Sequence, residues 1–245
     1  MGGKKHGHGH GHEHGHGQGH EHGHGRGHEH GHGHEHGHGH EHGHGHEHGH
    51  GHDHLGNPDD MAGYLERLEG ADREEWQQPD AVIAALGLRE GAKVAEIGPG
   101  PGYFTLRLSR VLGAAGRVFA IEAEPKMVDV LRARLRDGGV HNVDVVFAEQ
   151  GDALPQVAVD CVLVVNTFHH FPRGVDYLRA LAGRLSPGGT IANIDFHAIE
   201  TPVGPPAEHR ISREAFLDAA KQAGLELVRE ERFLPYQYFV VLAKR

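Results

Sequence analysis

The segment Glu96-Ile-Gly-Pro-Gly-Pro-Gly-Tyr-Phe104 places three glycines at alternate positions between an apolar run and an amphipathic run. The apolar run over 93–97 predicts a strand, and the spacing over 104–112 predicts a helix. A strand, a glycine turn and a helix in this order bring backbone N–H groups and a helix N-terminus to a ligand at the carboxyl edge of a parallel sheet. The segment therefore predicts a binding site, although it does not by itself name the ligand.

The rest of the folded part continues the alternation of strand and helix. We predict further strands over 117–121, 143–148, 159–165 and 190–195, with helices over 125–136, 171–185 and 212–223. Two strand-like runs close the chain, and they are broken only near Pro235, too close together for a helical crossover. The predicted fold class is therefore α/β, a Rossmann-like doubly wound sheet that is mostly parallel and ends in an antiparallel hairpin strand.

Composition divides the chain at residue 54. Residues 1–54 hold 23 of the 28 histidines and have no apolar side chain after Met1, so we expect a disordered tail rich in histidine and glycine. Residues 55–245 are long enough for one domain with its own core. We expect leading helices over 55–90, the first at Met61–Leu68 and a second that starts at an Asp72–Glu75 capping box and runs through Leu86. The sheet core should occupy 91–245.

Charge and cysteine content restrict the partners and the compartment. The formal net charge is −10 and no basic stripe is visible, which argues against nucleic acid and favours a small-molecule substrate. Cys161 is the one cysteine, which rules out an internal disulfide and fits a reducing compartment. No apolar stretch is long enough for a signal segment or a membrane span. We expect a cytoplasmic protein without a membrane partner; the oligomeric state does not follow from the sequence.

Three classes of ligand compete for the glycine turn. A phosphate-binding P-loop needs Gly-Lys-Ser/Thr, but Gly102 is followed by Tyr103 and Phe104. A dinucleotide fold prefers a small residue where Tyr103 stands, which disfavours NAD or FAD and leaves them as an alternative. The third pattern is acidic-x-Gly-x-Gly-x-Gly. It resembles motif I of the class I S-adenosylmethionine-dependent methyltransferases, and it is carried by Glu96, Gly98, Gly100 and Gly102.

Other segments follow in the order of the same family. Glu122 follows the second predicted strand, as does the carboxylate that holds the ribose diol in the family, and Asp152-Ala153 resembles the adenine segment. The run Asn166-Thr-Phe-His-His170 resembles the "lHH" segment of the methyltransferases related to ubiquinone and menaquinone biosynthesis. The resemblance covers roughly 76–245 and implies S-adenosyl-L-methionine as cofactor. The cofactor-binding residues that it implies are Glu96, Gly98, Gly100, Gly102, Glu122, Asp152, Ala153 and Asn166.

The chemistry implied is methyl transfer to a small-molecule acceptor. The donor is already activated, so the protein mainly places the reactants, and a base helps when the acceptor carries a proton. His169 and His170 follow the fourth predicted strand and are the candidate catalytic residues, with His197 a weaker one. The alternative for the pair is a structural role. Arsenite is disfavoured as acceptor because the folded part has only Cys161.

The tail has a chemistry of its own. Imidazoles at i and i+2 on glycine-rich backbone can wrap Ni²⁺ or Zn²⁺, so divalent metal ions are expected partners. The candidate metal ligands lie within the alternation that runs from His28 to His54, and they are His30, His32, His34, His36, His38, His40, His42 and His44. A purification tag and an inert low-complexity expansion are the other interpretations of the tail. An alternative function for the whole chain follows, a metal-handling protein that buffers nickel or zinc and uses its methyltransferase-like body as a carrier.

Overall fold

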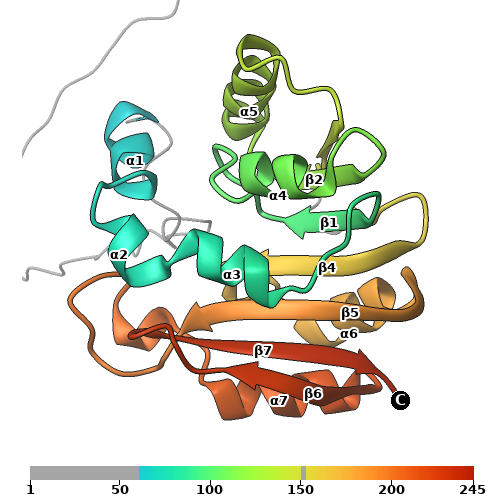
Figure 1. The fold of residues 1–245 in the computed structure, drawn as a ribbon. Coiled ribbons are helices and arrows are strands. Elements are labelled where there is room, and N and C mark those ends of the chain that lie inside the picture. Colours follow the sequence, from blue (N-terminus) through green and yellow to red (C-terminus); the bar gives the residue numbers. More distant parts are fainter. Residues whose placement is uncertain (1–60, 150–152) are drawn as a thin grey trace, which may run out of the picture. The chain divides into compact units, whose positions relative to one another are not determined.

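The computed structural model describes residues 61–149 and 153–245, which contain one seven-stranded sheet (Figure 1). The strand order is β3-β2-β1-β4-β5-β7-β6, and β7 runs antiparallel to both of its neighbours. The predicted fold class is confirmed, including the C-terminal hairpin. The strands are β1 (Lys93–Ile97), β2 (Arg117–Glu122), β3 (Val143–Phe147), β4 (Val159–Val165), β5 (Leu185–Phe196), β6 (Leu225–Glu231) and β7 (Gln237–Lys244).

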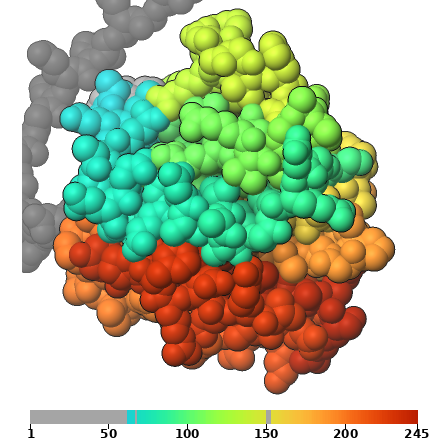
Figure 2. Space-filling model, viewed as in Figure 1, coloured from blue at the N-terminus to red at the C-terminus, as the bar shows by residue number. Residues whose placement is uncertain are grey.

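Helices cover both faces of the sheet. Three of them, α3, α4 and α5, pack on one face, and α6 and α7 pack on the other. In Figure 2 the segment from α2 to α3 forms a teal band between green α4 and the red C-terminal hairpin. The helices are α1 (Met61–Leu68), α2 (Arg73–Gln77), α3 (Pro79–Ala85), α4 (Thr105–Leu112), α5 (Pro125–Asp137), α6 (Gly174–Ala182) and α7 (Arg213–Gln222), with short 3₁₀ turns at Phe168–His170 and Ala207–His209.

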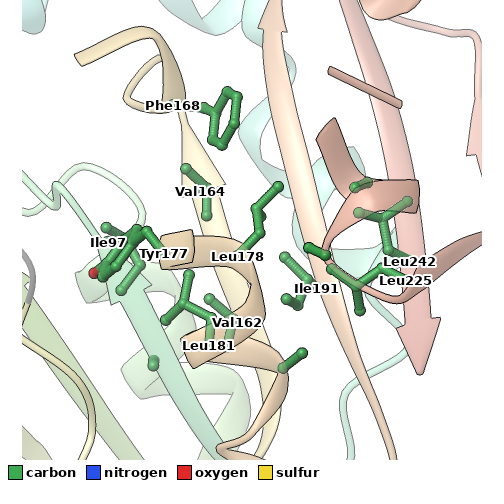
Figure 3. Packing of buried hydrophobic residues seen from close by; sticks show 14 of the residues in the cluster. Ile97, Val162, Val164, Phe168, Tyr177, Leu178, Leu181, Ile191, Leu225 and Leu242 are labelled. Atoms are coloured by element: carbon green, nitrogen blue, oxygen red, sulfur yellow. The ribbon is translucent and has the colours of Figure 1, made fainter. Parts of the chain in front are cut away.

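The core consists of side chains that point alternately to the two faces of the sheet along the buried strands. On β4, Val162 and Val164 point to the face of α6, where they meet Leu178 and Leu181 (Figure 3), whereas Cys161 belongs to the opposite face with α3 and α4. Central parallel strands are covered on both faces, so both sets of side chains are apolar. This packing leaves the carboxyl ends of the strands as the place where polar groups gather.

The leading segment departs from the prediction of one helix from Asp72 to Leu86. The structure has two helices there, because Gln78 adopts a left-handed backbone (φ 45°) and Pro79 begins α3. Proline has no N–H to continue the hydrogen-bonded ladder of α2, and it disfavours a helical residue before it. The capping box was also wrong, since the Asp72 side chain makes no cap hydrogen bond.

Strand β5 begins five residues before the predicted start at Thr190. Leu185 already pairs with Val159, and Thr190 pairs with Cys161, so the intervening residues of β5 bulge opposite a single residue of β4. Gly188 lies in this bulge with φ 76°, a conformation that glycine adopts without steric cost. The Pro187-Gly-Gly189 segment is thus an irregular part of the strand.

Candidate cofactor and active site

Four polar residues meet at the carboxyl edge of the sheet. Glu96 lies near the end of β1, Glu122 ends β2, Asn166 follows β4, and Asp195 lies near the end of β5. These strands are parallel neighbours in the order β2-β1-β4-β5, so their carboxyl ends share one edge. Such an edge, where the connections leave toward opposite faces of the sheet, is the usual ligand site of open α/β folds.

The glycine loop between β1 and α4 has a backbone that other residues do not readily adopt. Gly98, Gly100 and Gly102 have φ values of 68°, 55° and 96°. At Gly98 a side chain would also meet Thr167, because a Cβ there would lie 2.5 Å from Thr167 Oγ1. The loop after β1 and the loop after β4 are therefore in close approach, and the first glycine makes this possible.

The N–H groups of this loop already have partners within the protein. Gly98 donates to Ile121 O (2.9 Å), Gly100 to Glu122 Oε2 (2.9 Å) and Gly102 to Pro99 O (3.0 Å), while Pro99 and Pro101 have no N–H. A dinucleotide pyrophosphate is bound in such turns by free backbone N–H groups. The loop from 98 to 102 offers none, which counts against the NAD or FAD alternative.

Glu122 is held by main-chain donors. Its Oε2 accepts from Gly100 N, and its Oε1 accepts from the N–H groups of Ala123 (2.8 Å) and Glu124 (2.9 Å). Burial raises the pKa of this carboxyl, and the three backbone hydrogen bonds oppose that shift. Two oxygens have about four acceptor positions between them, so the carboxylate keeps acceptor capacity for a hydroxyl of a ligand.

Glu96 is a second buried carboxyl beside the loop. Its Oε2 accepts from Thr105 Oγ1 at 2.6 Å, and burial raises its pKa to about 7, with the nearby charge of Glu122 adding to the shift. A ligand that carries positive charge would relieve the repulsion between the two carboxylates. S-Adenosylmethionine carries a sulfonium and an ammonium together with a ribose diol, so its chemistry fits this pair of carboxylates.

The leading helices α1 and α2 dock on the glycine loop. The guanidinium of Arg73 lies over the Tyr103 ring at 3.9 Å, and the guanidinium of Arg107 lies over the same ring at 4.5 Å. Tyr103 Oη donates to Glu74 Oε1 (3.1 Å). Arg134 of α5 pairs with Glu69 and donates to Pro101 O. Stacked and charged contacts of this kind fix helices over a loop.

A buried chain of amides joins α2 to the end of β4. Gln77 Nε2 donates to Gln237 Oε1 (3.2 Å), and Gln237 Nε2 donates to Asn166 Oδ1 (2.6 Å). Asn166 has φ 52°, which is uncommon for a residue other than glycine and is held here by these contacts. Strained residues cluster at functional sites, and this one lies beside the glycine loop.

The candidate catalytic histidines lie in the 3₁₀ turn after β4. His169 Nδ1 lies 3.2 Å from Asp195 Oδ2, and the rings of His169 and His170 are 3.9 Å apart between centroids. Asp195 is fully buried, and its Oδ1 accepts from Phe196 N at 2.9 Å. The fourth and fifth strands thus bring a buried carboxylate to one of the two predicted histidines.

A loop after β5 borders the same edge and is organised by one side chain. The buried guanidinium of Arg210 lies over the Phe196 ring at 4.9 Å. The Trp76 ring of α2 also packs against Phe196, at 5.5 Å between centroids. Arg210 donates to the carbonyl oxygens of His197, Ile199, Val203 and Pro205. This single residue therefore holds the proline-rich loop in a defined shape, with Ile199 exposed.

Most of the predicted cofactor residues lie in this region. Glu96, the three glycines, Glu122 and Asn166 are at one edge, while Ala153 accepts a hydrogen bond from Tyr177 Oη through its carbonyl (3.0 Å). Asp152 and the candidate metal ligands His30 to His44 lie outside the described residues. Among the described residues no group of three or more His, Cys, Asp or Glu side chains is placed to hold a metal ion.

Asp195, Thr105 and Gln237 are among the residues of the site that were not predicted from the sequence. Asp195 had a usable signal, because it is the last residue of the strand predicted over 190–195 and so belongs at the carboxyl edge. Thr105 and Gln237 gave no signal. Their roles come from a helix start and a strand start that only the folded chain places beside Glu96 and Asn166.

Comparison with known proteins agrees with this geometry. Residues 94–189 match the family described as "Methyltransferase domain". A ubiquinone/menaquinone biosynthesis C-methyltransferase of Pasteurella multocida is 34% identical over 117 residues, which cover 46% of this chain and 43% of the relative. A protein-L-isoaspartate O-methyltransferase of Ignicoccus hospitalis is 29% identical over 133 residues, which cover 50% of this chain and 60% of the relative. The chain spans about half the length of the curated C-methyltransferases that it matches.

A solved structure covers more of the chain. The S-adenosylmethionine-dependent methyltransferase of Aquifex aeolicus superposes with a TM-score of 0.68 at 27% identity, and the match covers 74% of this chain and 96% of the other. Within the described residues, no helix is both long enough and apolar enough to span a membrane.

Proposed function

This chain carries the domain of the class I S-adenosylmethionine-dependent methyltransferases, and on that premise we propose that it transfers a methyl group from S-adenosylmethionine to a small-molecule acceptor. The observation that carries the proposal is the glycine loop, where the glycine N–H groups are used within the protein and two buried carboxylates, Glu96 and Glu122, adjoin it. This donor set suits a cation with a diol and disfavours a pyrophosphate. When bound, S-adenosylmethionine supplies an activated methyl group on a sulfonium.

Each residue at the edge has a role in this proposal. Glu122 accepts hydrogen bonds from the ribose hydroxyls, and Asp152 meets the adenine amino group. Glu96 and Asn166 hold the ammonium end, with Asn166 oriented by Gln237. Arg73 binds the carboxylate of the methionine part. Two observations support this role: Arg73 stacks on Tyr103, the residue directly after the glycine loop, and its described hydrogen bonds go to uncharged acceptors, the Gln77 side chain and the Leu68 carbonyl.

Calorimetry on the full chain tests the cofactor. S-Adenosylmethionine and S-adenosylhomocysteine should bind, and NAD should not. Glu122→Ala should weaken binding of S-adenosylhomocysteine by more than about 1 kcal/mol, because the ribose hydroxyls lose their acceptor. Glu226→Ala is the matched control, since Glu226 lies on the edge strand β6 with an exposed side chain and a surface ion pair to Arg245. Binding of NAD with no binding of either sulfur compound would overturn the proposal.

The acceptor enters beside the two histidines and the Arg210-held loop. The relatives named above include a C-methyltransferase and an O-methyltransferase, so their names do not choose an acceptor atom for this chain. The partly exposed ring of Trp76, which packs on the buried Phe196, offers aromatic surface on that side. We place the reaction in the cytoplasm because the single cysteine, Cys161, is buried in the core and has no partner for an internal disulfide.

We propose a second, separate activity for the tail, binding of Ni²⁺ or Zn²⁺ by the alternating histidines from His30 to His44. The support is the regular i, i+2 spacing of imidazoles in the sequence. Titration of the full chain with Zn²⁺ should show several equivalents that a chelator removes. The alternative in which the body is only a carrier for this tail fails if the full chain binds S-adenosylhomocysteine and releases it as product with any acceptor.

A further inference from the structure

A buried acid and a histidine form a pair at the active edge. Asp195 is 0% exposed, which is costly for a carboxylate unless it is paired. Its two oxygens have different partners, since Oδ1 accepts from Phe196 N (2.9 Å) and Oδ2 faces His169 Nδ1 (3.2 Å). An ionised carboxylate can only accept a hydrogen bond, so with Asp195 ionised the proton of His169 lies on Nδ1. The other ring nitrogen, Nε2, is then a proton acceptor.

The position of the pair connects it to the cofactor residues. His169 lies three residues after Asn166, whose N–H donates to Ile194 O (2.9 Å), so the turn that carries His169 begins beside the residue before Asp195. The glycine loop approaches the same turn at Thr167. The pair therefore lies at the edge where the methyl donor and the acceptor must meet.

We propose that His169 is the general base of the reaction and that Asp195 positions it, so that the acceptor is a molecule that loses a proton on methylation, with a hydroxyl or an acidic C–H group. The inference rests on the proposed methyl transfer. In the balanced step the acceptor atom forms a bond to the methyl carbon and its proton passes to His169 Nε2. The electrons of the broken carbon–sulfur bond stay on sulfur, and the imidazolium formed is stabilised by the Asp195 carboxylate.

The titratable groups around the pair come from three elements. His170 contacts the His169 ring from the same turn. Tyr238 of β7 faces Asp195, and burial together with the Asp195 charge raises the pKa of its hydroxyl, which donates to Ile211 O (3.3 Å). His197 follows β5, with its ring 5.9 Å from that of Tyr238. The raised pKa keeps the Tyr238 phenol protonated between pH 6 and pH 9, so this group does not contribute to the pH profile over that range.

The Asp195→Asn variant distinguishes a catalytic role of the His169–Asp195 pair from a purely structural role. The amide oxygen of the introduced asparagine must face the N–H of Phe196, because the opposite orientation would bring two hydrogen-bond donors, the NH₂ group and that N–H, together. Its NH₂ group then points at His169 Nδ1, which must accept, and the ring proton moves to Nε2. The variant keeps the size of the side chain and both of its contacts. It removes the general base, because a general base needs an unprotonated nitrogen and Nε2 of His169 now carries the ring proton.

The first measurement is the tautomer of His169 by ¹⁵N NMR of the histidine-labelled full chain, assigned by the signal lost in His169→Gln. The expected result is a proton on Nδ1 in the wild type and on Nε2 in Asp195→Asn. A wild-type proton on Nε2, or no change in the variant, would overturn the proposal. The tautomer measurement needs no methyl acceptor, so it tests the role of His169 by itself. A failure to bind S-adenosylhomocysteine would instead refute the proposed function.

The second measurement is release of S-adenosylhomocysteine with a panel of acceptors between pH 6 and pH 9. Phenols, alcohols and β-diketones carry a proton to lose; a tertiary amine and a thioether do not. Asp195→Asn should lower kcat on the protic acceptors by about 10² or more and flatten the pH profile, with affinity for S-adenosylhomocysteine changed by less than about twofold. His141→Gln, an exposed histidine before β3, is the control. Fastest turnover of the amine or thioether, or an unchanged profile in the variant, would contradict the proposal.

Discussion

Thr105 Oγ1 donates to Glu96 Oε2 at 2.6 Å, so the first residue of α4 supplies the hydrogen bond of a carboxyl that is otherwise buried on β1. One hydrogen bond does not offset the removal of a carboxylate from water, and burial raises the pKa of Glu96 to about 7. The protein thus keeps an unfavourable acid beside its glycine loop. The proposed cationic ligand would offset this burial, and the pH dependence of stability measures the cost of the acid in the free protein.

Glu96→Gln should change how stability depends on pH. The folded-state pKa is raised, so the folded protein holds the proton longer than the unfolded chain, and stability falls as pH rises from about 4.5 through about 7. The shift corresponds to roughly 3 kcal/mol. Glutamine can still accept from Thr105 and does not ionise. Urea unfolding at pH 5 and pH 8 should show the variant more stable than the wild type only at pH 8. Equal pH dependence in both proteins would show that Glu96 is ionised in the fold at little cost.

Gly98→Ala should destabilise the fold by more than its backbone angle requires. A Cβ at Gly98 would lie 2.5 Å from Thr167 Oγ1, whereas a Cβ at Gly87, which has a similar φ of 63°, meets nothing within 4 Å. Gly87→Ala therefore isolates the cost of positive φ, about 1 kcal/mol. Gly98→Ala should cost a further 1–3 kcal/mol or so in denaturant unfolding, as overpacking does.

Removal of the Thr167 side chain tests whether its contact with a Cβ at residue 98 causes the additional loss of stability. In Gly98→Ala combined with Thr167→Ala, the hydroxyl and methyl groups of Thr167 are gone, and part of the lost stability should return. If the double variant loses the sum of the two single effects, the contact between the two loops does not decide the cost.

Arg73→Gln should affect only ligands that carry a carboxylate. Burial lowers the pKa of Arg73 to about 10, so the guanidinium is still charged at neutral pH and gains from an anionic partner. Affinity for S-adenosylhomocysteine should fall by about 1.5–3 kcal/mol, the range for a hydrogen bond to a charged group, while affinity for 5′-methylthioadenosine, which lacks the carboxylate, should stay the same. Arg89→Gln, an exposed residue before β1, serves as control. Equal losses for both ligands would mean that Arg73 only supports α2.

Metal on the tail should leave the methyl-donor site unchanged at neutral pH. A glycine-rich chain without apolar side chains has nothing with which to dock on the body. Affinity of the full chain for S-adenosylhomocysteine should therefore be the same with saturating Zn²⁺ and after a chelator has removed it. A change above about tenfold, roughly 1.4 kcal/mol of coupling, would make the tail a metal-responsive regulator, with His169, His170 and His197 as the residues that could share the ion.

The sequence alone determined the fold class and which of the predicted site residues share the carboxyl edge of the sheet. Alternating strand and helix patterns predict a parallel sheet, and the ends of parallel strands meet at one edge, so Glu96, Glu122 and Asn166 could be placed together without coordinates. The family pattern then indicated the ligand. These inferences depend on local periodicity and on the residues at strand ends. Both can be identified from the amino-acid sequence without coordinates.

Only the tertiary structure decided which side chains act together. Gln77 reaches Gln237 across 160 positions, Gln237 reaches Asn166 across 71, and His169 meets Asp195 across 26. The break of the leading helix at Gln78 and the use of the glycine N–H groups within the loop also appeared only there. The physical reason is that buried polar groups must find partners, and the partner is whichever group the packed sheet and helices bring within about 3 Å, a choice that no local pattern contains.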